Sequence, residues 1–219
     1  MNYDFNFQMM VNYMPDILTG LQNTILISLI SIVLSVLWGV LVALARLSHK
    51  PWLKRAATAY VEFIRSTPLL VQVYFLFFGL PEFGIILPAF LVGVIALMLN
   101  SGAYAAEIIR AGIESIHLTQ YEAADCLAMS YSQKMRYVIL PQAFRNIFPP
   151  LIGQASYLVK DSALVSVMGV VDLTKAAAVT QAVTFRPMEA FLPAMVFYLV
   201  IILTLIYGTS FLEKRMRRW

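Results

Sequence analysis

The sequence is poor in the residues that most metal and catalytic sites use: it has one cysteine, Cys126, and two histidines, His49 and His117. A single thiol excludes an intramolecular disulfide and a metal site built from several cysteines. We expect Cys126 to be a small buried apolar residue and both histidines to lie in solvated loops. No His-x-x-x-His pair, Ser/His/Asp constellation or pair of catalytic carboxylates is recognisable, which argues against an enzyme. A Gly-x-x-x-x-Gly-Lys-Ser/Thr phosphate loop is missing too, so energy from ATP would have to come from another chain.

Charged residues are also scarce. They make up 13% of the 219 residues, and 60% of the residues are hydrophobic, whereas soluble proteins contain about 25% charged residues. Apolar runs of about 20 residues, enough to cross a hydrocarbon core of about 30 Å, recur along the chain. The sequence therefore predicts an all-α integral membrane protein with about five transmembrane helices. The connections are short, so residues 1–219 are expected to form one transmembrane domain.

We predict the five spans at about residues 21–45, 57–80, 89–110, 142–159 and 188–211. Pro68 interrupts the second span, where it is either a hinge or a tolerated kink without motion. Residues 1–20 suit a short helix in the outer interface. Residues 160–187 are too polar for a plain span.

The basic residues predict which side of the membrane each loop occupies. No Lys or Arg precedes Arg46, whereas basic residues cluster at 46–55, 134–145 and 214–218. Because cytoplasmic loops carry an excess of Lys and Arg, this pattern predicts an N-terminus outside and a cytoplasmic C-terminus. Five crossings that begin outside also end inside, in agreement with the charge of the tail.

The longest polar stretch, about residues 111–141, contains one predicted helix at Tyr121–Met129 and a second that Ser130 caps and that ends near Pro141. A charged loop between two spans is often only solvated, and composition alone does not decide against that reading. The order Glu122-Ala123-Ala124, followed by the small residue Ala128 and by Leu140-Pro141, resembles the EAA loop of ABC importer permeases. Ala128 stands where that family usually has Gly.

Three further segments, Tyr60–Gln72, Leu99–Glu107 and Lys160–Ser166, resemble permeases of the polar amino acid branch of that family, the bacterial histidine/glutamine/arginine type. The resemblance implies a type I ABC importer permease fold in the bacterial cytoplasmic (inner) membrane, which translocates polar amino acids by alternating access. It implies a cytoplasmic ABC ATPase dimer that binds ATP and Mg, so that this chain holds no cofactor. It also implies an identical or paralogous second permease and an extracytoplasmic amino-acid-binding protein, and no nucleic acid partner. The residues expected to couple to the ATPase are Glu122, Ala123, Ala124, Ala128, Leu140 and Pro141.

Ionisable groups at bilayer depth are costly and so indicate function. Glu62 and Arg65, like Glu107 and Arg110, are three residues apart on a helix, a spacing that allows an ion pair. Glu62 either pairs in this way or lines the substrate path. Asp161 suits the ammonium group of an amino acid, although buried amides and hydroxyls often only bond to neighbouring helices. The candidate substrate-binding residues are Asp161, Asn100, Glu62, Tyr104, Gln72 and Ser101.

The main alternative is a secondary amino acid transporter or channel that is not coupled to ATP. Such a protein would transport without an ATPase, and it would leave the polar insertion at 111–141 unexplained.

Overall fold

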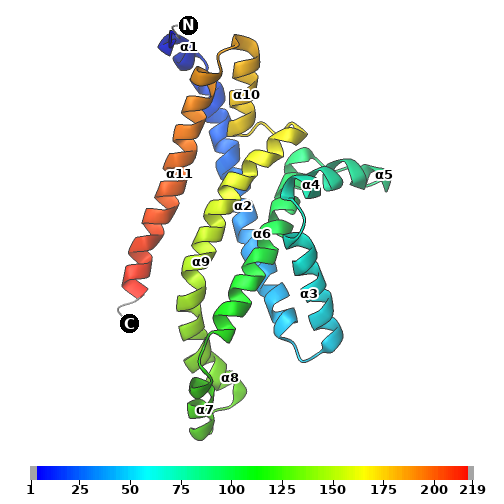
Figure 1. Cartoon of the computed structure of the whole chain (residues 1–219), viewed down its shortest axis with the longest axis vertical. Helices are drawn as coiled ribbons and strands as arrows, with labels where there is room; N and C mark the ends of the chain where they lie inside the picture. The colour runs from blue at the N-terminus through cyan, green and yellow to red at the C-terminus, as the bar shows by residue number, and fades with distance from the viewer. Residues whose placement is uncertain (1–3, 217–219) are drawn as a thin grey trace.

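The computed structural model describes the backbone of residues 4–216 and the side chains of residues 4–209. Every regular element in this part of the chain is a helix, as the sequence predicts. The long helices run side by side, with α1 at one end of the molecule and the short helices α7 and α8 at the other (Figure 1). The elements are α1 (Phe7–Asn12), α2 (Met14–Leu47), α3 (Pro51–Arg65), α4 (Leu69–Tyr74), the π turn η1 (Phe75–Gly79), α5 (Leu80–Glu82), α6 (Ala89–Glu114), α7 (Leu118–Cys126), α8 (Tyr131–Lys134), the π turn η2 (Met135–Ile139), α9 (Leu140–Asp161), the 3-10 helix η3 (Ser162–Met168), α10 (Leu173–Thr184) and α11 (Pro187–Met216).

Three helices, α2, α6 and α11, are each long and apolar enough to cross a membrane. Two further stretches reach that length only across a bend: α3 with the segment α4 to α5, bent by 106°, and the stretch Tyr131–Met168 with α10, bent by 49°. The described chain therefore has three to five candidate spans. The five predicted spans correspond to counting each bent pair once.

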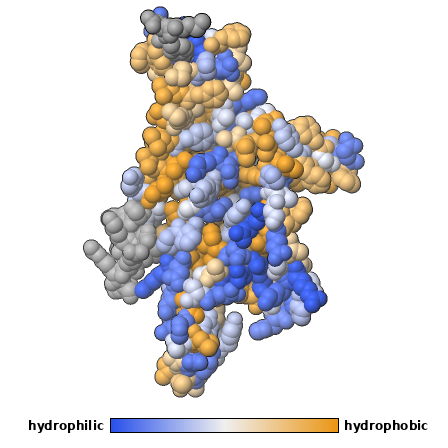
Figure 2. All heavy atoms as spheres, in the orientation of Figure 1, coloured by the Kyte–Doolittle hydropathy of each residue, from blue (hydrophilic) through white to orange (hydrophobic). Residues whose placement is uncertain are grey.

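Hydropathy differs between the regions of the surface. Hydrophobic residues cover the upper part of α11 and the segment α4 to α5, whereas hydrophilic residues gather over the lower end of α3 (Figure 2). The predicted sidedness of the termini stays a prediction. The side chains of the predicted basic tail, residues 214–218, lie outside the described part of the chain.

The first span is longer than the sequence suggests. Helix α2 begins at Met14 rather than near residue 21, so the predicted interfacial helix of residues 1–20 is reduced to the short α1. Pro15 lies in the first turn of α2, where a proline is favoured because the first N–H groups of a helix have no intrahelical acceptor. The start signal was therefore present in the sequence, inside the segment assigned to the interface.

Helices α2 and α6 pack closely because small residues line their contact. A Cβ atom added at Gly39 would lie 2.7 Å from the Cβ of Ala105 and 3.1 Å from the backbone nitrogen of Ala106. Neither of these atoms can move aside without moving helix α6 itself. The small side chains thus set the distance between the two central helices.

Gly39→Ala is therefore expected to lower the free energy of unfolding by about 1–3 kcal/mol, because the added methyl group overpacks the contact between α2 and α6. Gly153→Ala is the matched control, since a Cβ at Gly153 meets nothing within 4 Å. Thermal unfolding of the two purified variants beside the parent protein measures the difference. Equal melting temperatures for Gly39→Ala and the parent would show that the contact is not tight.

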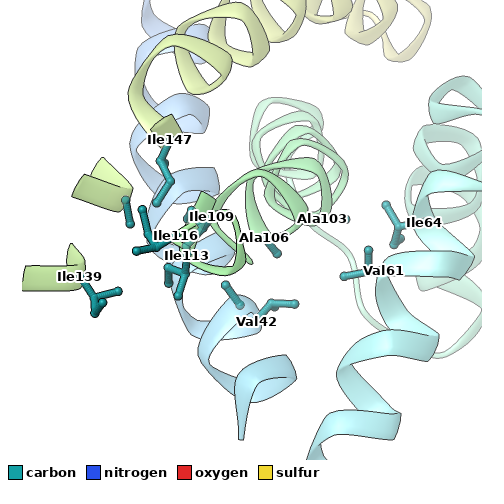
Figure 3. Close-up of a cluster of buried hydrophobic side chains, with 12 residues drawn as sticks. Val42, Val61, Ile64, Ala103, Ala106, Ile109, Ile113, Ile116, Ile139 and Ile147 are labelled. Atoms are coloured by element: carbon teal, nitrogen blue, oxygen red, sulfur yellow. The ribbon is translucent and has the colours of Figure 1, made fainter. Parts of the chain in front are cut away.

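Figure 3 shows a cluster of buried apolar side chains from α2, α3, α6, η2 and α9. Val42 of α2 and Val61 of α3 pack against α6, and Ile139 and Ile147 approach the same helix from the chain that follows α8. Ile139 is completely buried. Displacement of α7 and α8 would therefore act directly on α6.

The predicted end of the second polar helix near Pro141 is wrong. The helix continues from Tyr131 through Pro141 as far as Met168, with the π turn η2 directly before α9. A π turn inserts one residue and leaves one carbonyl without its usual N–H partner, so a proline can follow it without breaking the helix. Gly169, whose φ is +84°, ends this long stretch.

Candidate functional site

The bend at Pro68 separates two helices and creates a hollow. Helix α3 ends at Arg65, and Pro68, in an extended conformation, is the N-cap of α4. A cavity of about 610 Å³ lies against this bend, between α3, α6 and α9. We call it the Pro68 cavity. Its lining residues are Arg65, Ser66, Thr67, Pro68, Leu69, Asn100, Tyr104, Gln154, Tyr157 and Asp161.

Three of the six predicted substrate residues, Asp161, Asn100 and Tyr104, line the Pro68 cavity. Ser101 and Gln72 lie one layer behind the lining. The Ser101 hydroxyl accepts a hydrogen bond from Gln154 Nε2 at 3.1 Å. Residues from three separate helices therefore converge at one place.

Gln72 holds the bend together. Its Nε2 atom donates to the Ile64 carbonyl at 2.8 Å and to Thr67 Oγ1 at 2.7 Å. Ile64 lies four residues before Pro68, which has no N–H group to donate to that carbonyl. The Gln72 side chain thus replaces the backbone hydrogen bond that the proline removes.

Glu62, the remaining predicted residue, does not reach the Pro68 cavity. Its side chain is exposed in a separate hollow beside Lys54 and Arg55. The alternative that Glu62 pairs with Arg65 is not found either: among the described side chains, the carboxylate nearest to Arg65 is Glu107, at 4.0 Å. Packing of α3 against α6 brings Arg65 to that carboxylate.

Arg65 is the cavity residue that sequence reasoning assigned to another role. Its guanidinium group lies over the Tyr104 ring, 5.2 Å from the centroid, in a cation–π arrangement. The signal available in the sequence was its place directly before Ser66, Thr67 and Pro68, because helices usually end at or before the residue that precedes a proline, which puts Arg65 beside the break. Among the described residues that line the cavity, Arg65 is the one cation and Asp161 the one anion.

Lys160 and Asp161 are adjacent in the sequence but line different hollows. Asp161 lines the Pro68 cavity, whereas Lys160 lines a different, mainly apolar hollow between α10 and α11. The Lys160 ammonium group lies 4.4 Å from the centroid of the Tyr157 ring. Consecutive helical residues diverge by about 100°, which explains the separation.

The predicted pair of Glu107 and Arg110 is present and belongs to a larger network. Glu107 also pairs with Arg46 of α2, and Arg110 also pairs with Glu114. These contacts tie α2 to α6 near one end of α6. Their role in the described structure is to join helices, as expected for this pair.

The predicted coupling residues lie at the end of the molecule that α7 and α8 form (Figure 1). Ala124 is 2% exposed and packs inward, so it supports α7 rather than facing a partner. An ion pair between Asp125 and Lys134 joins α7 to α8. The other coupling candidates, Glu122, Ala123, Ala128, Leu140 and Pro141, are exposed.

Helix α7 runs from Leu118 to Cys126 rather than from Tyr121 to Met129, because the backbone turns at Ala128. Ala128 has a φ of +50°, in the left-handed region that glycine adopts without strain. The structure thus gives the physical reason for the glycine that is usual at this position. Ser130 is the predicted cap, and with Gln133 it forms a reciprocal capping box.

The expectation for Cys126 needs correction, whereas His117 is exposed in the connection between α6 and α7, as predicted. Cys126 is exposed, at the C-terminal end of α7, and is not a buried apolar residue. His117 is the N-cap of α7, where its Nδ1 atom accepts a hydrogen bond from the Thr119 N–H at 3.3 Å. Both residues belong to the ends of a short helix whose limits were misplaced.

Comparison with known proteins gives consistent matches over nearly the whole chain. Residues 35–218 match the family described as binding-protein-dependent transport system inner membrane component. A probable glutamine ABC transporter permease of Bacillus subtilis, GlnM, is 39% identical over 199 residues, which cover 91% of this chain and 92% of that protein. The arginine transport system permease ArtQ of the same organism is 36% identical over 219 residues, 99% of each chain. A crystal structure of an amino acid ABC transporter with histidines matches with a TM-score of 0.92 and 42% identity, covering 97% of this chain and 100% of that one.

Proposed function

We infer what this protein does from its membership of one family: the chain belongs to the binding-protein-dependent transport system inner membrane components. It is a non-catalytic permease subunit of an amino acid ABC importer and lies in the inner membrane with several membrane-spanning helices. Such a system includes an ATPase and a binding protein. Within it, we assign to this chain the passage of a polar amino acid through the Pro68 cavity.

One observation carries the assignment of the substrate: Arg65 and Asp161 line the same cavity. An amino acid carries a carboxylate, which a guanidinium group binds through two parallel N–H donors, and an ammonium group, which a carboxylate binds. Arg65 is the partner for the first group and Asp161 for the second. Asn100 and Tyr104 supply hydrogen-bonding atoms beside them, and the names of the glutamine and arginine permeases suit a polar side chain.

Transport by alternating access then needs a connection from the ATPase to this cavity. In our proposal, α7 docks on a cytoplasmic ATPase dimer, with its exposed residues Glu122 and Ala123 in contact. The movement passes through the buried cluster around Ile139 to α6, which carries Asn100 and Tyr104. A second permease, identical or paralogous, completes the pathway, and the N-terminus lies outside.

Uptake by the reconstituted complex tests the function. Proteoliposomes that contain the permease, its ATPase and the binding protein are expected to accumulate one or more polar amino acids from a panel of the twenty common ones, and only with ATP inside. Uptake that an ion gradient drives in liposomes holding the permease without its ATPase would instead support a secondary transporter. Vesicles with an inactive ATPase are the control.

A further inference from the structure

We propose that Gln72 is a positioning residue, which holds the Asn100 side-chain amide in one orientation and so presents the Asn100 Oδ1 atom, a hydrogen-bond acceptor, to the Pro68 cavity. This inference rests on the proposed function, because it concerns how the same cavity recognises an amino acid. It replaces the expectation that Gln72 itself contacts the substrate.

The orientation of the Gln72 amide follows from its neighbours. The Nε2 atom lies 2.8 Å from the Ile64 carbonyl oxygen and 3.2 Å from the Thr67 carbonyl oxygen. Backbone carbonyls only accept hydrogen bonds, so the NH₂ end of Gln72 has to face them. Pro68 has no N–H group to donate to the Ile64 carbonyl, and the Thr67 hydroxyl is farther away, at 3.4 Å, so Gln72 is the nearest side-chain donor to this carbonyl whether or not a substrate is bound. The Oε1 atom of Gln72 is therefore turned toward α6.

The orientation of Asn100 follows from that of Gln72. Asn100 Nδ2 donates to Gln72 Oε1 at 2.9 Å, and an oxygen at that place accepts only from the NH₂ end of the amide. No described residue donates to Asn100 Oδ1, and in the described part of the chain the fully enclosed side-chain atoms without a partner are the hydroxyls of Ser28 and Ser31. Asn100 Oδ1 is not one of these enclosed atoms, and the Pro68 cavity is the hollow that Asn100 lines, so the cavity is where this oxygen is accessible.

The cavity therefore has a defined pattern of hydrogen-bonding groups. Asn100 Oδ1 and the Asp161 carboxylate accept hydrogen bonds, whereas Arg65 donates them. An ammonium group has three donors, which a carboxylate and an amide oxygen satisfy together. If Gln72 were lost, the Asn100 amide would be free to rotate, and an NH₂ group facing the cavity would oppose an ammonium group. Gln72 thus sets the specificity of a site that it does not touch.

A double-mutant cycle tests whether Gln72 orients the Asn100 amide. The measurement is equilibrium binding of radiolabelled glutamine and of radiolabelled arginine to the purified permease–ATPase complex in lipid nanodiscs, without binding protein. Asn100→Ala and Gln72→Leu are each expected to weaken binding about tenfold, the effect of one hydrogen bond to a charged group. The double variant should bind no more weakly than Asn100→Ala alone. In an Asn100→Asp background Gln72→Leu should cost nothing, because a carboxylate presents an oxygen in either orientation.

The controls separate positioning from a structural role at the bend. Val73→Ala loosens the packing of α4 below the bend but leaves the bond between Gln72 and Asn100, and Val73 does not line the Pro68 cavity, so binding should stay within about twofold of the parent. Gln72→Met, unbranched like glutamine, is measured beside Gln72→Leu and serves alone if the leucine variant does not assemble. Losses that add in the double variant, or persist with Asn100→Asp, would overturn the inference while leaving the proposed function intact. If the parent complex binds neither glutamine nor arginine, the inference and the proposed function are both refuted.

Discussion

Glu122→Lys is expected to weaken association of the permease with its ATPase at least about tenfold and to reduce ATP-dependent uptake in proportion. Glu122 is exposed on α7, on a helix that packs inward through Ala124. No described residue forms an ion pair with Glu122, so the permease itself should fold and insert normally. The reversed charge at position 122 should therefore affect ATPase binding and not the folding of the permease.

Cys126 gives a direct measurement of docking. It is the single cysteine of the chain, and it is exposed at the C-terminal end of α7. Addition of the ATPase should slow maleimide labelling of Cys126 in the parent permease and have little effect in the Glu122→Lys variant. Labelling is expected to be equal for both permeases when no ATPase is present.

Glu82→Lys is the matched control for this experiment, because it makes the same charge change on an exposed glutamate of α5, away from α7 (Figure 1). That variant should keep normal ATPase binding. Normal binding and normal uptake in Glu122→Lys as well would refute the docking role of α7.

Asp161→Asn is expected to weaken amino acid binding in the Pro68 cavity roughly 10- to 100-fold, since Asp161 is the one carboxylate among the described residues that line the cavity. The substitution preserves size and shape, so assembly with the ATPase should be unchanged. Binding is measured as for Gln72, on the complex without binding protein, because the binding protein would otherwise dominate the apparent affinity.

Glu62→Gln is the control for Asp161→Asn. It neutralises a carboxylate on α3 that is exposed and lies outside the Pro68 cavity. Its binding and uptake should match those of the parent. Unchanged affinity in Asp161→Asn would remove Asp161 from the site, and a loss in Glu62→Gln would restore the role that the sequence suggested for Glu62.

Much of the candidate site was predictable because its residues are unusual for their surroundings. Asp161 and Asn100 are polar groups in apolar helices, where each such group carries a cost and so indicates a purpose. Arg65 was assigned wrongly because an i,i+3 partner, Glu62, was available in the sequence. Spacing along one helix says which pairs are able to meet, but competition from another helix decides which pairs form.

The sequence by itself determined the membrane class, the break at Pro68 and the cap at Ser130, and it indicated the apolar spans without their limits. These features depend on composition and on groups a few residues apart, so the local sequence is enough to predict them. Only the tertiary structure decided that Arg65 lies near Glu107, that Gln72 bonds to Asn100 and that the helix continues through Pro141. The first two depend on how α3, α4 and α6 pack, and the third on a π turn, which the surrounding helices support. Which hydrogen-bonding atoms face the cavity follows from that packing.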